Sequence, residues 1–165
     1  MSEPTGSTPP APVSGWQPPS PVAGPAPGFE FGGPGARLVA YIIDVVITGV
    51  VILLLSLLIA LLAVTVPVLI FLPIIAIILI PLVYFPYYWS RDGQTPGMQI
   101  MGIKVVADLD GGPVTVGMAI LRYIGYIISA AVFYIGFIWI FIDKRQRGWH
   151  DLIGGTVVIK VPGAR

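Results

Sequence analysis

The sequence predicts a membrane protein of the all-α class: a small helical bundle of two full transmembrane helices and a third apolar segment, with short cytoplasmic β-strands and a disordered N-terminal tail. Of the 165 residues, 56% are hydrophobic and only 10% are charged, whereas about a quarter of the residues in an average soluble domain are charged. From Leu38 to Ser90 the chain carries a single formal charge, Asp44. This apolar run is long enough for two crossings of a bilayer.

Residues 1–34 are expected to form a disordered tail. They hold more than half of the chain's 17 prolines, with many glycines and serines, and such a composition buries too little apolar surface to offset the entropy of ordering. A linker and a proline-motif docking segment both fit this composition. No lysine or arginine precedes Arg37, so the positive region of a cleavable signal peptide is absent and the first apolar segment is expected to remain as an anchor.

The membrane domain is predicted over residues 35–161, and its first two apolar segments cover residues 38–64 and 68–89. Each has at least the roughly 20 residues that a spanning helix requires, and Pro67 between them predicts a turn. Prolines in the second segment remove backbone donors and predict kinks; they are Pro73, Pro81 and Pro86. The aromatic residues of 84–89 are typical of a helix end at the lipid headgroups.

Beyond the second segment the chain becomes polar. A tight turn is predicted at five consecutive residues, Gly93, Gln94, Thr95, Pro96 and Gly97, because proline fixes the first central φ of a turn and glycine accepts a positive φ at the next. Residues 103–106 and 156–161 are predicted as short strands, and residues 114–116 as a candidate returning strand. These strands are expected to form one small sheet against the membrane domain.

The third apolar segment, residues 118–142, leaves two topologies open. Basic residues flank it on both sides, with Lys104 before it and Lys144, Arg145 and Arg147 after it, and positive-inside bias places both flanks in the cytoplasm. A single straight span, which hydropathy alone predicts, would separate them. A re-entrant helical hairpin that bends near residues 132–136 would return the chain to the same side, and this is the topology that we favour.

Asp44 is the principal candidate for a functional residue, because an ionised carboxylate inside hydrocarbon is costly unless it is paired or hydrated. A spacing of seven residues places Arg37 and Asp44 on nearly the same helix face. Two interpretations remain open: Asp44 binds a proton or cation, or it is a structural carboxylate held by Arg37 or by Arg122 of the third segment. Asp151 is a second acid, expected to pair with Arg37 or to cap a turn.

Several other chemical functions are not expected. The chain has no cysteine and a single histidine, His150, so no metal site is predicted and no cofactor is expected. The sequence contains no serine, histidine and carboxylate pattern typical of a nucleophilic enzyme, so enzymatic activity is not expected. A formal net charge of +1 without a dense basic patch argues against a nucleic-acid partner.

Three motifs together resemble the RDD family of bacterial membrane proteins. Arg37 with Asp44 is similar to the family's arginine at the start of the first helix and the aspartate within it. Residues 93–106 are similar to the family's central loop. Arg122 and the stretch 143–158, which includes Asp151 as the second aspartate, are similar to its C-terminal signature.

The resemblance covers about residues 33–161 and implies a multi-pass protein of the bacterial cell (inner) membrane, with its N-terminus in the cytoplasm. Met98 departs from the family pattern, which often has lysine there, so no essential cation is expected at that position. For some members the resemblance implies monovalent cation/proton exchange, and Asp44 would then be the protonatable ligand.

The alternative function is that of a structural or accessory membrane protein. In that case pairs among four charged residues would fix the packing of the helices, and the cytoplasmic face would bind a partner; these residues are Arg37, Asp44, Arg122 and Asp151. Both hypotheses predict contact with the lipid bilayer, and both predict a homo-oligomer or a membrane protein partner.

Overall fold

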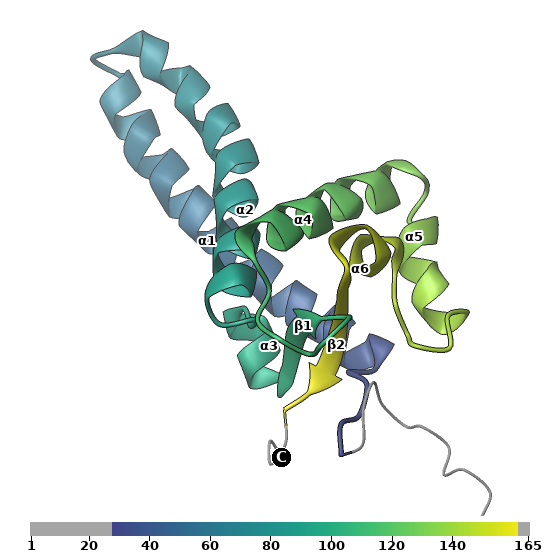
Figure 1. The fold of residues 1–165 in the computed structure, drawn as a ribbon. Coiled ribbons are helices and arrows are strands. Elements are labelled where there is room, and N and C mark those ends of the chain that lie inside the picture. The colour runs from purple at the N-terminus through teal and green to yellow at the C-terminus, as the bar shows by residue number, and fades with distance from the viewer. Residues whose placement is uncertain (1–27, 162–165) are drawn as a thin grey trace, which may run out of the picture.

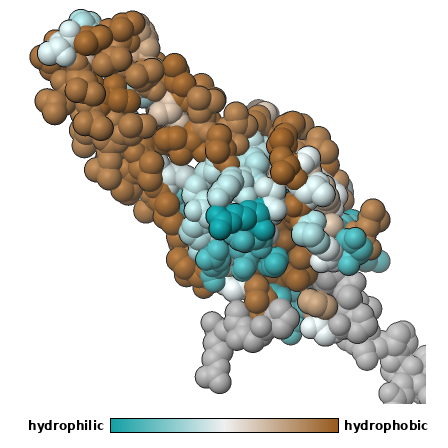
Figure 2. Space-filling view, turned by 60° about the vertical axis from the view of Figure 1, so that its left-hand side comes forward, coloured by the Kyte–Doolittle hydropathy of each residue, from teal (hydrophilic) through white to brown (hydrophobic). Residues whose placement is uncertain are grey.

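The computed structural model describes residues 28–161, which form a long helix hairpin projecting from a small folded base (Figure 1). The hairpin consists of α1 (Pro34–Ala63), the short 3-10 helix η1 (Pro67–Phe71) and α2 (Leu72–Arg91). The other elements gather at the end of the long helices that lies opposite the hairpin turn. Figure 2 shows a hydrophobic surface along almost the whole hairpin, whereas hydrophilic residues collect mainly on the base.

The two helices of the hairpin are long and apolar enough to cross a membrane. α1 has 30 residues, which corresponds to about 45 Å of helix, and a bilayer core is about 30 Å thick. Pro34 lies in the first turn of α1 and Pro67 begins η1, positions at which a missing backbone donor costs no helical hydrogen bond. The prediction of two long apolar helices joined near Pro67 is confirmed.

The prolines of α2 differ in their effects. Pro73 is the second residue of the helix, where the backbone donors have no intrahelical partner, so the kink predicted at Pro73 is wrong and this proline helps to start the helix. Pro81 and Pro86 lie inside α2. Each of them leaves the carbonyl four residues earlier without its helical donor.

The base contains a two-stranded antiparallel sheet in which β1 (Ile103–Ala107) pairs with β2 (Thr156–Lys160), with Val105 opposite Val158. The short helix α6 (Trp149–Gly154) immediately precedes β2. β-branched residues, which favour extended structure, make up most of both strands. The two strands predicted on either side of the third apolar segment are therefore confirmed.

Two threonines start helices where the sequence predicted a turn and a strand. The hydroxyl of Thr95 accepts a hydrogen bond from the N–H of Met98 (3.2 Å) and caps α3 (Pro96–Ile100), so the predicted turn continues as one helical turn. The strand predicted at residues 114–116 is wrong. Thr115 caps the helix that begins directly after it, and threonine is a favoured residue at this position.

The third apolar segment is not one straight helix. It forms α4 (Val116–Ala131), followed by α5 (Ile135–Ile138) and η2 (Trp139–Phe141), and the chain bends by 112° between α4 and the following pair. Phe133 and Tyr134 in the break have positive φ angles. The bend lies where the turn of a re-entrant hairpin was predicted.

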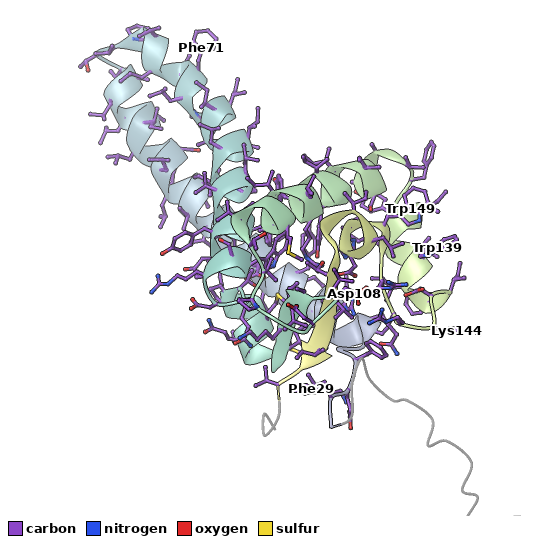
Figure 3. The ribbon with its side chains drawn as sticks, viewed as in Figure 1. Phe29, Phe71, Asp108, Trp139, Lys144 and Trp149 are labelled. Atoms are coloured by element: carbon purple, nitrogen blue, oxygen red, sulfur yellow. The ribbon has the colours of Figure 1, made fainter. Side chains whose placement is uncertain are left out.

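The polar stretches before and after this segment meet in the base. Asp108, which precedes α4, forms ion pairs with Arg145 (2.7 Å) and Arg147 (2.9 Å), which follow η2. Figure 3 places Asp108 and Lys144 at the base and Phe71 at the far end of the molecule, beside the hairpin turn. Both flanks of the third apolar segment therefore lie at the same end of the molecule.

The described end of the predicted tail contacts the sheet. Phe31 forms an isolated bridge with Ile159 of β2, and residues 32 and 33 lead from there into α1. The remainder of the predicted tail, residues 1–27, lies outside the described residues.

Glycines allow α4 and α6 to pack closely. A Cβ atom on Gly125 would lie only 2.5 Å from the Cα atom of His150, and one on Gly154 would lie 2.9 Å from the Cβ atom of Arg122. Neither position therefore accepts a larger side chain without movement of the opposing helix. This close approach brings Arg122 beside Asp151.

Candidate functional site

Asp44 lies where α1 enters the base, and it is only 1% exposed. Three neutral groups donate hydrogen bonds to its carboxylate: the hydroxyl of Thr95 to Oδ2 (2.5 Å), and the hydroxyl of Tyr84 (2.8 Å) and the backbone N–H of Gly97 (2.9 Å) to Oδ1. These donors belong to α2 and to the start of α3. The carboxylate thus joins three helices, and its hydrogen bonds replace those that water would provide.

Gly97 permits the close approach of α3 to α1. A Cβ atom on this residue would overlap the carbonyl oxygen of Ala40 and would lie 3.0 Å from Cγ of Asp44. With no side chain between them, the N–H of Gly97 reaches the carboxylate directly. Glycine at this position is therefore part of the Asp44 site.

The residues before Thr95 attach this loop to the sheet. Gly93 has a φ of +71°, a conformation that favours glycine, and its carbonyl accepts a hydrogen bond from the N–H of Val105 (2.8 Å). The side-chain amide of Gln94 donates to the carbonyl of Ile103 (2.9 Å). The predicted turn motif thus positions Thr95 against the carboxylate of α1.

The expectation that an arginine holds Asp44 is wrong. Arg37 and Arg122 both bind Asp151 of α6 instead: Nη1 of Arg37 is 2.8 Å from Oδ2, and Nη1 of Arg122 pairs with Oδ1. Side chains of a helix lean toward its N-terminus, so the guanidinium of Arg37 points away from Asp44, which follows it. The sequence analysis also considered an ion pair between Arg37 and Asp151, and this pair is present.

Asp151 is an ionised carboxylate that also starts α6. It accepts a hydrogen bond from the N–H of Gly148 (2.9 Å), the residue before the helix. Burial is the largest single effect and raises the pKa of the Asp151 carboxyl, but the opposing effects of Arg122, His150 and Arg37 together hold the pKa well below its ordinary value. Arg122 also donates to the hydroxyl of Thr156 (2.7 Å).

His150, adjacent to this carboxylate, is neutral. Its burial, assisted by the charges of Arg122 and Arg37, lowers its pKa to about 3, although Asp151 opposes the shift. The imidazole ring packs against Tyr126, with a distance of 4.3 Å between the ring centroids. The group of Arg37, Arg122 and Asp151 therefore carries one net positive charge.

Aromatic residues cover the buried guanidinium of Arg122. Its Cζ atom lies 4.9 Å from the ring centroid of Trp89 and 5.7 Å from that of Tyr126, within the range of cation–π attraction. Trp89 belongs to α2 and is 2% exposed. Residues of α1, α2, α4 and α6 thus meet around one ion cluster.

A cavity of about 20 Å³ lies between Asp44 and the two arginines, with room for about one water molecule. Arg37, Trp89 and Arg122 line it together with Asp44 and Thr95. Among the residues that the structure describes, Nη2 of Arg37, Nε1 of Trp89 and Nε of Arg122 are buried without a hydrogen-bond partner. Asp44 and the cluster of Arg37, Arg122 and Asp151 thus lie on either side of one small cavity.

Two aromatic residues of the site were misassigned from the sequence. Tyr84 and Trp89 were predicted to lie at the lipid headgroups, but Tyr84 binds Asp44 and Trp89 is buried on Arg122. Tyr87, which is 49% exposed, has the exposure expected of an interfacial residue. The sequence contained one signal for a buried position: a tyrosine hydroxyl or a tryptophan N–H needs a hydrogen-bond partner or a charged neighbour when it leaves water.

Comparison with known proteins places these residues in a family. A model of the RDD family matches residues 31–155. The uncharacterized protein YxaI of Bacillus subtilis is 42% identical over 91 residues, which are 54% of this chain and 59% of that protein. A proline-rich antigen homolog of Mycobacterium tuberculosis is 27% identical over 77 residues (47% of this chain, 32% of that protein), and the uncharacterized protein RP437 of Rickettsia prowazekii is 32% identical over 77 residues (47% and 42%).

The matches span at most 59% of the length of these relatives. No solved structure matches the chain. The family model covers both arginines and both aspartates of the site. The resemblance that the sequence motifs indicated is thereby confirmed, and the chain belongs to the RDD family.

Proposed function

We propose that this protein is a transporter of the bacterial inner membrane in which Asp44 binds and releases a proton in exchange for a monovalent cation. The observation that carries the proposal is the absence of a cationic partner: among residues 28–161, the carboxylate is bound by hydroxyl and backbone N–H groups alone. An arginine partner would favour the charged form at all physiological pH values. With neutral donors, no direct cationic partner within residues 28–161 opposes protonation of the carboxylate.

The hydroxyl partners support reversible protonation. Thr95 donates to Asp44 and accepts from the N–H of Met98, and a hydroxyl can both donate and accept. Thr95 therefore remains a suitable partner when Asp44 carries a proton. A hard cation would find oxygen ligands in the same group of side chains.

The proposed topology places the base in the cytoplasm and the hairpin across the membrane. Positive-inside bias supports this orientation, because the basic residues of the described chain lie in the base and at the ends of the helices that enter it. The ion pairs of Asp108 with Arg145 and Arg147 support a re-entrant third segment, since a straight span would separate these residues. An exposed apolar stripe on α4 would then face lipid; it includes Ile120, Ile124 and Ile127.

A route across the membrane requires an oligomer or a partner subunit. Only 11% and 6% of the residues in the apolar windows of the two hairpin helices are buried. Two helices with outward-facing Leu and Ile side chains enclose no polar path. Association of several hairpins would cover these faces, and we propose a homo-oligomer or a complex with another membrane protein.

Replacement of Asp44 by asparagine tests the exchange reaction. Asparagine has nearly the same size but binds no proton, so everted vesicles with the variant are expected to lose cation-dependent proton flux. Asp92→Asn, at the exposed end of α2, is the matched control and should retain wild-type flux. Insertion is measured in parallel. Normal flux in Asp44→Asn, or no flux in the wild-type protein, would contradict the proposal.

Single cysteines test the topology, since the chain has no native cysteine. Thr65→Cys, exposed at the hairpin turn, is expected to react with an impermeant reagent in whole cells. Asp110→Cys and Lys144→Cys, both exposed on the base, should react only after the membrane is opened. Reaction of Lys144→Cys but not Asp110→Cys in whole cells would instead indicate a third complete span.

A second candidate function is that of an accessory membrane protein. The cluster of Arg37, Arg122 and Asp151 favours it, because these residues join α1, α4 and α6 through buried ion pairs. On this hypothesis Asp44 is also structural, and Asp44→Asn should insert poorly, unfold readily in detergent or lose a co-purifying protein. The wild-type protein would then show no flux to lose.

A further inference from the structure

Three residues that line the cavity beside Asp44 carry hydrogen-bond donors that the described chain leaves unsatisfied. Nη2 of Arg37, Nε1 of Trp89 and Nε of Arg122 have no partner, and all three side chains belong to residues that line this one cavity. The side chains of Arg37 and Arg122 are 9% and 2% exposed, and Trp89 is 2% exposed. Buried donors nearly always have an acceptor, so an acceptor is expected close to these three donors.

The charges around the cavity depend on the state of Asp44. Arg37 and Arg122 contribute two positive charges and Asp151 one negative charge. An ionised Asp44 brings the sum to zero, whereas a protonated Asp44 leaves one uncompensated positive charge. The remaining titratable groups nearby are uncharged at neutral pH; they are Tyr41, Tyr84, Tyr126 and the neutral His150.

We infer that this cavity binds a monatomic anion, such as chloride, together with the proton on Asp44. The volume of about 20 Å³ exceeds the ~10–15 Å³ that one water molecule requires, and it is too small for a carboxylate or a phosphate. Phe85, Ile103 and Val158 belong to the apolar part of the lining and offer no side-chain acceptor. Acceptor oxygens in the lining belong to Tyr41, Asp44, Thr95 and Tyr126, and none of them forms a hydrogen bond with the three unsatisfied donor atoms.

The inference goes beyond cation exchange and does not depend on it. An anion placed beside an ionised Asp44 would bring a second negative charge into a buried site, which is unfavourable at low dielectric. Protonation removes this repulsion. By linkage, bound chloride favours the protonated acid to the same extent that protonation favours chloride.

Thermal unfolding of the purified full-length chain in an uncharged detergent tests the anion site. At equal sodium concentration, the unfolding midpoint is expected to be higher in chloride than in gluconate, which is too large for the cavity, because a ligand that binds only the folded state stabilises it. The difference between the two salts should increase as the pH is lowered and Asp44 becomes protonated. Equal midpoints in the two salts at both pH values would overturn the inference.

Trp89→Phe removes one donor and retains an aromatic ring over Arg122. Its apparent affinity for chloride is expected to be about tenfold lower, as for the loss of one hydrogen bond to an ion. Trp139→Phe, at a residue that does not line the cavity, should leave the affinity unchanged. An unaltered chloride effect in Trp89→Phe would show that the anion binds elsewhere.

Asp44→Asn separates the anion site from proton binding. The amide is neutral at every pH, so the chloride effect in this variant should persist and lose its pH dependence. In a weakly buffered solution, chloride should also cause proton uptake by the wild-type protein and none by the variant. A chloride effect that stays pH-dependent in Asp44→Asn would overturn the coupling between chloride binding and protonation of Asp44. A loss of cation-dependent proton flux in the same variant tests the proposed cation exchange and not the anion site.

Discussion

Asp151→Ala is expected to be the most destabilising single substitution in the base, at about 3–5 kcal/mol of unfolding free energy. It leaves Arg37 and Arg122 buried beside each other with no carboxylate between them. It also removes the acceptor for the N–H of Gly148 at the start of α6. Equilibrium unfolding in mixed detergent micelles, followed by tryptophan fluorescence, measures the loss.

Two further variants show whether uncompensated charge is the cause. Asp92→Ala removes an exposed carboxylate that is 3.6 Å from Arg91, and exposed pairs contribute at most about 1 kcal/mol. Adding Arg37→Met to Asp151→Ala should recover part of the lost stability, because one buried charge disappears. A loss below about 1 kcal/mol in Asp151→Ala, or no recovery in the double variant, would contradict the ion-cluster interpretation.

Gly97→Ala is expected to have the second largest effect, roughly 1–3 kcal/mol of unfolding free energy, through overpacking. The new methyl group would overlap the carbonyl of Ala40. α3 must therefore move away from α1, and the hydrogen bonds of Thr95 and Gly97 to Asp44 lengthen or break. The same unfolding measurement gives the stability, and proton flux gives the effect on the site.

Gly117→Ala is the matched control for this substitution. Gly117 lies in the first turn of α4, and a Cβ atom there would have its nearest neighbour at 4.0 Å, at Oγ1 of Thr115. Alanine is also the better helix former by about 1 kcal/mol. The control should be as stable as the wild-type protein or more so, and an equal loss in both variants would show that the close contact of Gly97 is unimportant.

Local composition was sufficient to predict the hairpin and the sheet. Leu and Ile residues on either side of Pro67 predicted two long helices, and runs of β-branched residues predicted β1 and β2. Pro73 was misjudged because a proline interrupts a helix only after its first turn, and the start of α2 is not evident in a continuous apolar run. The strand expected at residues 114–116 does not form, because Thr115 caps α4 and the helix begins at the next residue.

The partners of the charged residues could not be derived from the sequence. Two arginines and two aspartates allow several pairings, and the spacing of Arg37 and Asp44 on one helix face favoured the wrong one. The direction in which helical side chains lean decides this case. The groups that donate hydrogen bonds to Asp44 lie 40, 51 and 53 positions further along the chain. No local sequence pattern therefore predicts them.

The close seating of Gly97 on α1 has a mechanical consequence for the far end of the hairpin. α1 is one continuous helix from the base to Ala63, and the part beyond Asp44 is about 28 Å long. A tilt of roughly 10° at Asp44 would displace the hairpin turn by about 5 Å. A change in the hydrogen bonds of this carboxylate would thus reach the far end of the hairpin as a sideways displacement of a rigid helix.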